Sequence, residues 1–251
     1  MRCGIFRPIA ISFCGYASPG ACMCLSDFLR SQFGSPSGLF GSLFVAPFLN
    51  LTNIGLIRAS VELLEPEPDD RVLDVGFGGG YSLLALADRM PNGRVVGVDH
   101  SPDMVVAAAN LIQAKKLQAR IRVRRGNVVN LPFAANTFDR VLTVNTIYYW
   151  QNLRAALGEI ARVLKPGGRL AVAFRSPESL RLVTLAWDNF RRYEPQEVAE
   201  AMRKTGFRVP RVVHTNLWRI PDDLALIGES KKRSPRQADH QVAAVAGQQL
   251  R

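Results

Sequence analysis

The sequence contains no cysteine after residue 24. All four cysteines fall before that point, at Cys3, Cys14, Cys22 and Cys24. The later residues can therefore form neither a disulfide bond nor a cysteine nucleophile. Cys22 and Cys24 are separated by one residue, whereas zinc-binding pairs usually have at least two between them. The cysteine content thus excludes a disulfide-stabilised body and gives no sign of a metal site.

Long apolar runs are also missing. Hydrophobic residues make up 47% of the 251 residues and charged residues 21%, which is enough apolar mass for the core of one α/β domain. Charges or glycines break every apolar stretch well before the ~18 residues that would span a membrane. We therefore predict a cytoplasmic protein with no transmembrane helix.

Acidic residues are scarce relative to basic ones. There are 21 Asp and Glu against 32 Lys and Arg, a net charge of +11, and such a balance favours polyanionic partners. The basic residues are nevertheless spread along the chain. The two short clusters, Arg120–Arg125 and Lys231–Arg233, have no aromatic residues among them. We favour a basic surface without a dedicated polyanion, and a nucleic-acid partner stays the less favoured alternative.

The chain divides into four parts. Residues 1–24 are irregular, and a charge and a proline interrupt their weak hydrophobic stretch, so we expect a leader rather than an export signal. Residues 25–66, which contain apolar residues at helical spacing, are expected to form an N-terminal helical lid. Residues 67–228 form the main domain. Residues 229–251, where the apolar pattern ends, are expected to be a disordered tail.

Strand and helix patterns alternate through the main domain. This alternation predicts a doubly wound, Rossmann-like α/β fold with a mostly parallel sheet and helices on both faces. The last two strands have no helix between them, which predicts an antiparallel hairpin. Arginines alternate with apolar residues on the third strand, a pattern that protects a sheet edge. The expected strands are 71–75, 94–99, 121–125, 138–144, 169–174, 207–213 and 224–227, and the expected helices are 80–90, 102–116, 152–164 and 195–204.

A glycine-rich loop follows the first strand. Ligands of doubly wound sheets bind at the carboxyl ends of the strands, and glycines let the backbone turn tightly against them. The second strand ends in Asp99, which is placed to accept hydrogen bonds from two ribose hydroxyls. Dinucleotide-binding and S-adenosylmethionine-binding folds share this pair of features. The loop reads Asp74-Val75-Gly76-Phe77-Gly78-Gly79-Gly80.

Two observations favour S-adenosylmethionine over a dinucleotide. The fingerprint Gly-x-Gly-x-x-Gly fails in both frames, since it needs glycine where Tyr81 and Leu83 stand. A dinucleotide would also place its pyrophosphate beside the carboxylate of Asp74, which is a repulsive pairing. S-adenosylmethionine carries an ammonium and a sulfonium instead, for which acidic and carbonyl oxygens are suitable partners.

At these motifs the sequence resembles the class I S-adenosylmethionine-dependent methyltransferases of the small-molecule type, and is similar to methyltransferase type 11. The resemblance covers roughly residues 30–228 and implies a seven-stranded sheet with an antiparallel last strand. It rests on four segments: VLDVGFGGG (72–80), VVGVDHSPDM (95–104), RGNVVNLPFAANTFDRVLTVNTIYYW (125–150) and LKPGGRLAVAF (164–174).

The resemblance also implies a cofactor site. The loop glycines would surround the methionine part of the cofactor, Asp99 would bind the ribose, and Asn127 and Val128 would flank the adenine. The family often has aspartate where Asn127 stands. An amide oxygen still accepts a bond from the adenine amino group, without charge assistance. The expected cofactor-binding residues are Asp74, Gly76, Phe77, Gly78, Gly80, Asp99, His100, Met104, Asn127, Val128 and Asn145.

Several of these residues have a plainer interpretation. Asp74 can cap the turn through backbone N–H groups, and Asp99 can be an ordinary residue at a helix N-terminus. His100 can be a packing or surface residue. The run Tyr148-Tyr149-Trp150 can be core aromatics rather than a substrate wall.

Methyl transfer by in-line displacement needs alignment more than it needs a base. Residues 25–66 and 175–194 are the expected lid over the acceptor, and their aromatic content favours a hydrophobic or aromatic small molecule. Tyr148, Tyr149 and Trp187 are the expected substrate contacts. His214, late in the chain at a strand end, is the one candidate base.

Two other functions stay open. Enzymes that methylate base amino groups carry Asp/Asn-Pro-Pro-Tyr after the fourth strand, where they stack a flipped base. This chain has Asn145-Thr146-Ile147-Tyr148 there, without either proline. A non-catalytic cofactor-binding protein is the second alternative, and the intact glycine loop with Asp99 argues against it.

Overall fold

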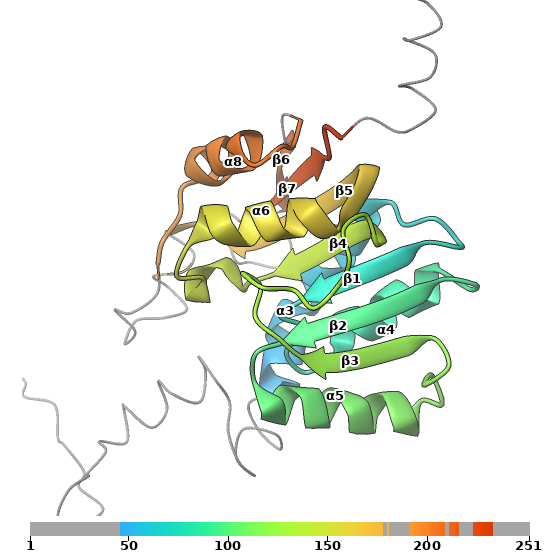
Figure 1. Ribbon diagram of the computed structural model, residues 1–251. Helices are drawn as coiled ribbons and strands as arrows, with labels where there is room; N and C mark the ends of the chain where they lie inside the picture. The colour runs from blue at the N-terminus through green and yellow to red at the C-terminus, as the bar shows by residue number, and fades with distance from the viewer. Residues whose placement is uncertain (1–45, 178–179, 181–190, 209–210, 216–222, 233–251) are drawn as a thin grey trace, which may run out of the picture.

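A seven-stranded sheet forms the centre of the molecule (Figure 1). The computed structural model describes residues 46–177, 180, 191–208, 211–215 and 223–232. The strand order is β3-β2-β1-β4-β5-β7-β6. The strands are β1 (Arg71–Val75), β2 (Arg94–Asp99), β3 (Ile121–Arg125), β4 (Phe138–Val144), β5 (Leu164–Arg175), β6 (Arg211–Thr215) and β7 (Asp223–Glu229).

Of the seven strands, β7 alone runs in the opposite direction to the others. β1 pairs in parallel with β2 and β4, β2 with β3, and β4 with β5. β7 lies between β5 and β6 and is antiparallel to both. The predicted mostly parallel sheet with an antiparallel end is therefore confirmed. The strand order switches direction between β1 and β4, which is where doubly wound sheets bind their ligands.

Helices cover both faces of the sheet, as predicted. Neighbouring strand residues point to opposite faces, so Val72 and Leu73 belong to two different core clusters. No helix in the described residues is long and apolar enough to cross a membrane. One face carries α3 (Ala46–Leu64), α4 (Tyr81–Arg89) and α5 (Pro102–Ala114), and the other carries α6 (Leu153–Val163) and α8 (Pro195–Lys204) (Figure 1).

The helix expected within the N-terminal lid packs into the core. α3 contacts α4, β4, β5 and β7, and it buries Leu56, Ile57, Val61 and Leu64. The helix and the sheet thus form one packed unit across the boundary expected at residue 66. The remainder of the expected lid and the expected leader, residues 1–45, lie outside the described residues.

Of the strand expected at 207–213, the structure describes β6 from Arg211 and an isolated antiparallel bridge between Phe207 and Ser230, and residues 209 and 210 lie outside the described part. Phe207 also belongs to the C-terminal cap of α8. Its N–H donates to the carbonyl of Met202 at 3.0 Å, and Gly206 takes the left-handed φ of 100°. This is the Schellman arrangement, in which an apolar residue follows the glycine and packs back on the helix. An apolar residue placed there by a helix cap gives the same sequence signal as the start of a strand.

The first residues of the expected tail are ordered. Glu229 ends β7, and three residues later the Lys232 ammonium donates to the carbonyls of Arg162 and Leu164 at 2.9 and 2.7 Å. These carbonyls lie at the end of α6, so Lys232 caps that helix. The expected tail therefore begins no earlier than residue 233, and residues 233–251 lie outside the described part of the chain.

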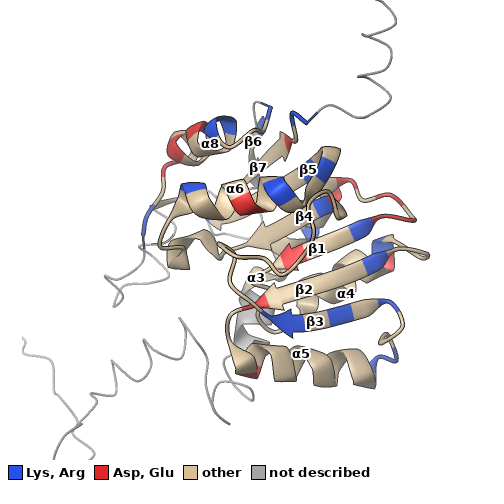
Figure 2. Ribbon diagram, viewed as in Figure 1, with Lys and Arg blue, Asp and Glu red and all other residues tan. Residues whose placement is uncertain are grey.

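β3 forms one edge of the sheet, as its arginine pattern predicted. It pairs with β2 alone. Arg122, Arg124 and Arg125 are exposed on it, and Figure 2 shows the basic residues along this strand. Charged side chains on an edge strand discourage pairing with other chains.

Candidate active site

The glycine loop between β1 and α4 is held by close backbone packing. Gly76, Gly78 and Gly80 all have left-handed φ angles, of 75°, 53° and 86°. A Cβ added to Gly76 would lie 2.3 Å from Cγ2 of Thr146. The Gly76 N–H donates to the carbonyl of Val98 at 2.7 Å, which ties the loop to β2. The loop therefore needs glycine for both its turn and its packing.

Asp99 lies directly beside this loop. One carboxylate oxygen accepts from the N–H of Gly78 at 2.9 Å, and the other accepts from the N–H of Ser101 at 2.9 Å. Burial raises the pKa of Asp99, and the two backbone bonds oppose that rise. The N-cap of α5 is Ser101, so Asp99 is not simply the cap of that helix. A Cβ on Gly78 would meet nothing within 4 Å, so the loop is open next to the carboxylate.

Asp74, at the carboxyl half of β1, is almost completely buried, with 1% exposed. Burial raises its pKa to about 7, a hydrogen bond with Ser82 lowers it, and the charge of Asp99 raises it further. Among the described residues, the second carboxylate oxygen (Oδ2) has no hydrogen-bond partner. The partner of Asp74 is a side chain of α4, which speaks against its being a cap of the turn's backbone. A buried carboxylate with a free oxygen is suited to a positively charged ligand group.

Three other residues expected at the cofactor are placed differently from one another. Phe77 and Met104 are buried in the core under α4 and α5, and a Cβ on Gly97 would lie 2.5 Å from the ring of Phe77. Only the backbone of Phe77 is therefore available at the loop. His100 is exposed, and its carbonyl accepts from Arg125 at 3.2 Å.

The loop after β3 lies beside the end of β2. The N–H of Gly126 donates to the carbonyl of Asp99 at 3.0 Å. Asn127 is exposed, and its side-chain oxygen accepts from the N–H of Val129 at 3.2 Å. Val128 packs against the core cluster. Asn127 and Val128 thus adjoin Asp99 from the next strand, as expected for residues around an adenine ring.

A side-chain network joins the ends of β4 and β5 to α3. Asn145, which follows β4, has a left-handed φ of 55°. Its amide nitrogen donates to the side-chain oxygen of Asn53 at 2.9 Å, and its amide oxygen accepts from the hydroxyl of Tyr148 at 3.1 Å. The Tyr148 hydroxyl also accepts from the N–H of Arg175. The guanidinium of Arg175 donates to Asn53 at 3.5 Å.

This network decides between the two interpretations of the aromatic run. Tyr148 and Trp150 are buried with 6% exposed each, whereas Tyr149 is 45% exposed. The rings of Tyr148 and Tyr149 meet edge to face at 6.4 Å. Tyr148 is therefore a core residue that positions Asn145, and only Tyr149 presents an aromatic surface to the outside.

Comparison with known proteins agrees with this arrangement. Residues 73–172 match the model of the methyltransferase domain family. This part of the chain is a methyltransferase domain. Erythromycin 3''-O-methyltransferase from Saccharopolyspora erythraea is 38% identical over 113 residues, and demethylmenaquinone methyltransferase from Thermus thermophilus is 36% identical over 115 residues. These matches cover 45% and 46% of this chain but 37% and 51% of the relatives, so the chain spans about half of their length or less.

Solved structures share the fold of the methyltransferase domain. An S-adenosylmethionine-dependent methyltransferase from Aquifex aeolicus matches with a TM-score of 0.60 and 22% identity, covering 71% of this chain and 93% of that one. A putative methyltransferase from Haloferax volcanii, solved in complex with a methyltransferase activator, matches with a TM-score of 0.66 and 23% identity, covering 77% and 96%.

Sequence reasoning missed two residues at the edge of the methyltransferase domain, Asn53 and Arg175. Asn53 lies 92 residues before its partner Asn145, and a lone asparagine on a helix carries no signal of such a contact. Of the residues predicted to contact or activate the methyl acceptor, Trp187 lies outside the described residues. His214 pairs with Leu224 in the edge strand β6, and its side chain is outside the described part.

Proposed function

We propose that this chain transfers a methyl group from S-adenosylmethionine to a small molecule by in-line displacement. The observation that carries the proposal is the pair of buried carboxylates, Asp74 and Asp99, at adjacent strand ends beneath an open glycine loop. The methyltransferase domain family, and relatives named for small-molecule acceptors, support it.

The residues of the loop suit this cofactor. Asp99 is fixed by two backbone N–H groups and keeps lone pairs that can accept bonds from ribose hydroxyls. The unpaired oxygen of Asp74 suits a cationic group. Gly78 leaves the loop surface free of side chains where a ligand approaches. Asn127 and Val128 would flank the adenine.

When bound, S-adenosylmethionine supplies a methyl group on a positively charged sulfur, which is already activated toward nucleophiles. The chain then has to hold the acceptor in line and exclude water. Asn145 and Tyr148 would fix the wall between the two reactants, because both are locked in the network that joins β4, β5 and α3. Exposed Tyr149 would offer an aromatic surface to an apolar acceptor. His214 is the candidate base where the acceptor needs one.

The test of the proposal is calorimetric titration with S-adenosylmethionine and S-adenosylhomocysteine, with NAD as the control ligand. We expect both adenosyl compounds to bind and NAD not to bind. Asp99→Ala removes charge-assisted bonds to the ribose, so affinity should fall about 100-fold. Asp88→Ala, an exposed carboxylate at the far end of α4, is the matched control and should change nothing. Failure of both adenosyl compounds to bind would contradict the proposal.

A nucleic-acid acceptor is the competing function, and the exposed arginines of β3 favour it. Arg125, the last residue of β3, pairs in register with Asp99, and Arg122 and Arg124 are exposed on the same strand. Phosphate contacts by such residues would give tRNA binding that weakens steeply with salt. A mobility-shift titration with tRNA at two salt concentrations separates the two functions. A third function, cofactor binding without catalysis, is rejected by methyl turnover with any acceptor.

A further inference from the structure

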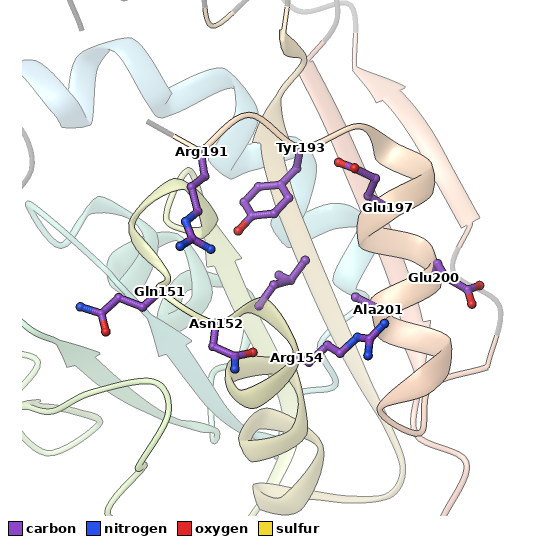
Figure 3. Close-up of a pocket in the computed structure, with 9 residues that line it drawn as sticks. Gln151, Asn152, Arg154, Arg191, Tyr193, Glu197, Glu200 and Ala201 are labelled. Atoms are coloured by element: carbon purple, nitrogen blue, oxygen red, sulfur yellow. The ribbon is translucent and has the colours of Figure 1, made fainter. Parts of the chain in front are cut away.

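A second hollow lies between the first turns of α6 and the facing side of α8 (Figure 3). We call it the α6–α8 groove. Its volume is about 500 Å³, within the range of small-molecule sites. Both helices begin on the side of the molecule where the parallel strands end (Figure 1). The lining of the groove comes from residues 151–154 and from several residues between 191 and 201. None of these belongs to the glycine loop.

The floor of the groove is apolar. Leu153 and the ring of Tyr193 pack against the core cluster, and Ala201 is buried in it. Gln151 and Asn152 stand at the side formed by α6. A ligand with a compact apolar body would therefore lie on carbon atoms while polar groups remain at the rim.

The groove is lined by two arginines and two glutamates. Neither Arg154 nor Arg191 has an ion-pair partner among the residues that the structure describes. The two glutamates that also line the groove are already engaged. Glu197 accepts from the N–H of Glu194 at 3.0 Å as part of a helix cap, and Glu200 forms ion pairs with the basic residues of the next turn of α8, at 3.0 and 3.1 Å. Arg154 and Arg191 are therefore the charged groups of the lining that have no partner among the described residues.

Tyr193 adds a hydrogen-bond donor that no described residue accepts from. Its hydroxyl is buried and has no partner in the described part of the chain. Buried polar groups are nearly always paired, so an unpaired one calls for a specific explanation. Figure 3 shows this hydroxyl and the side chain of Arg191 directed toward the same part of the groove.

We propose that the α6–α8 groove is a binding site for a small organic anion. The carboxylate or phosphate of the ligand binds Arg191 and Arg154, as guanidinium groups bind planar oxyanions. The Tyr193 hydroxyl donates a further bond to the anion. The apolar part of the ligand rests on Leu153 and Ala201. The groove shares no residue with the glycine loop, so its test does not depend on cofactor binding, although Arg191 and Tyr193 belong to the segment 175–194 expected over the methyl acceptor.

The proposal is tested by titrating isotope-labelled protein with two probes, benzoate and inorganic pyrophosphate, and following amide shifts by NMR. We expect shifts at Leu153 and Ala201 with at least one probe, at about millimolar affinity or tighter. The double variant Arg154→Gln/Arg191→Gln should weaken that binding at least about tenfold, and Tyr193→Phe about threefold. Stronger binding of benzoate assigns a carboxylate ligand, and stronger binding of pyrophosphate assigns a phosphate.

Arg89→Gln is the matched control, since Arg89 ends α4 on the opposite face of the sheet, pairs with Glu62 and does not line the groove. Its probe affinity should stay within about twofold of the unmodified protein, well below the loss in the double variant. An equal loss in Arg89→Gln, or no shift with either probe, overturns the proposal. Binding of S-adenosylhomocysteine measured in every variant shows that each is folded. If the unmodified protein binds an anionic probe but not S-adenosylhomocysteine, the result counts against the methyltransferase function and leaves the anion site standing.

Discussion

The two halves of the candidate active site are built by different means. On β1 and β2, backbone N–H groups hold the site together, and Asp99 receives bonds from residues 21 and 2 positions away. On β4 and β5, side chains hold it together, and Asn53 meets partners 92 and 122 positions away. Backbone bonds depend little on which side chains are present. The first half can therefore stay constant while the second varies, which is the arrangement expected where one cofactor serves different acceptors.

Apart from Asp99→Ala, Gly76→Ala is expected to have the largest effect on ligand binding. The new Cβ would clash with Thr146, and alanine disfavours the left-handed backbone at residue 76. The clash and the backbone strain together disfavour the present loop conformation by about 2–4 kcal/mol. Affinity for S-adenosylhomocysteine, measured by calorimetry, should fall roughly 30-fold or more. Gly158→Ala in α6 is the control: an added Cβ there meets nothing within 4 Å, and helix propensity should stabilise the fold by about 0.5–1 kcal/mol. Unchanged affinity in Gly76→Ala would show that the loop does not form the site.

Asp74→Asn is expected to have the next largest effect, and only above neutral pH. Because burial raises the pKa of Asp74 to about 7, the carboxyl is neutral below that pH and gives a cationic ligand no charge. Affinity for S-adenosylmethionine should therefore rise with pH through about 7 and then level off. At about pH 8.5 the variant should bind about tenfold more weakly, and at about pH 5.5 the two proteins should match.

The same group has a stability consequence of definite sign. A carboxyl whose folded pKa is raised stays neutral in the folded protein while the unfolded chain ionises. The free energy of unfolding should thus fall as the pH rises from about 4 to about 7. Asp74→Asn should reduce this slope, which denaturant titrations at several pH values would show, and Asp99, whose pKa is also raised, should account for part of the remainder. A slope that the substitution leaves unchanged would assign the pH dependence to other groups.

Tyr148→Phe is expected to have the smallest effect on cofactor binding and a clear effect on stability. It leaves Asn145 and the N–H of Arg175 without their buried partner, at a cost of about 1–3 kcal/mol in the free energy of unfolding. Affinity for S-adenosylhomocysteine should stay within about threefold. Tyr81→Phe, whose hydroxyl makes an exposed bond with Arg58, should cost less than about 0.5 kcal/mol. A loss of affinity well beyond threefold in Tyr148→Phe would mean that the second half of the site also determines cofactor binding.

The difference between the halves also explains what could be predicted from the sequence. The sheet, its helices and the first half follow from local patterns: buried strands, a glycine turn and an acid at the next strand end. The motif gives positions but not the directions of side chains. Phe77 lies in the loop and Met104 on α5, and both side chains face the core. Packing of α4 and α5 on the sheet decides this, and no single motif encodes it.

The second half could not be predicted, because its contacts join distant segments. Nothing local marks Asn53 or Arg175 as partners of Asn145. The cap formed by Lys232 on α6 is missed for the same reason, since a lysine beyond the last strand has the sequence signature of a solvated tail. Phe207 combines two local roles, since it packs in the cap of α8 and bridges Ser230 beside β7. The roles of Trp187 as a substrate contact and of His214 as a base stay predictions.

The place of β7 has a consequence for how the chain acquires its structure during synthesis. β7 is the last of the described strands to leave the ribosome, yet it lies inside the sheet, with seven register pairs to β5 and five to β6. Until residue 229 has emerged, β5 is an open edge with unpaired backbone groups, and such edges invite pairing with other chains. The first five strands can pair earlier, but the nascent domain is exposed to aggregation until its final strand inserts. Fragments truncated shortly before this strand should therefore be insoluble rather than merely inactive.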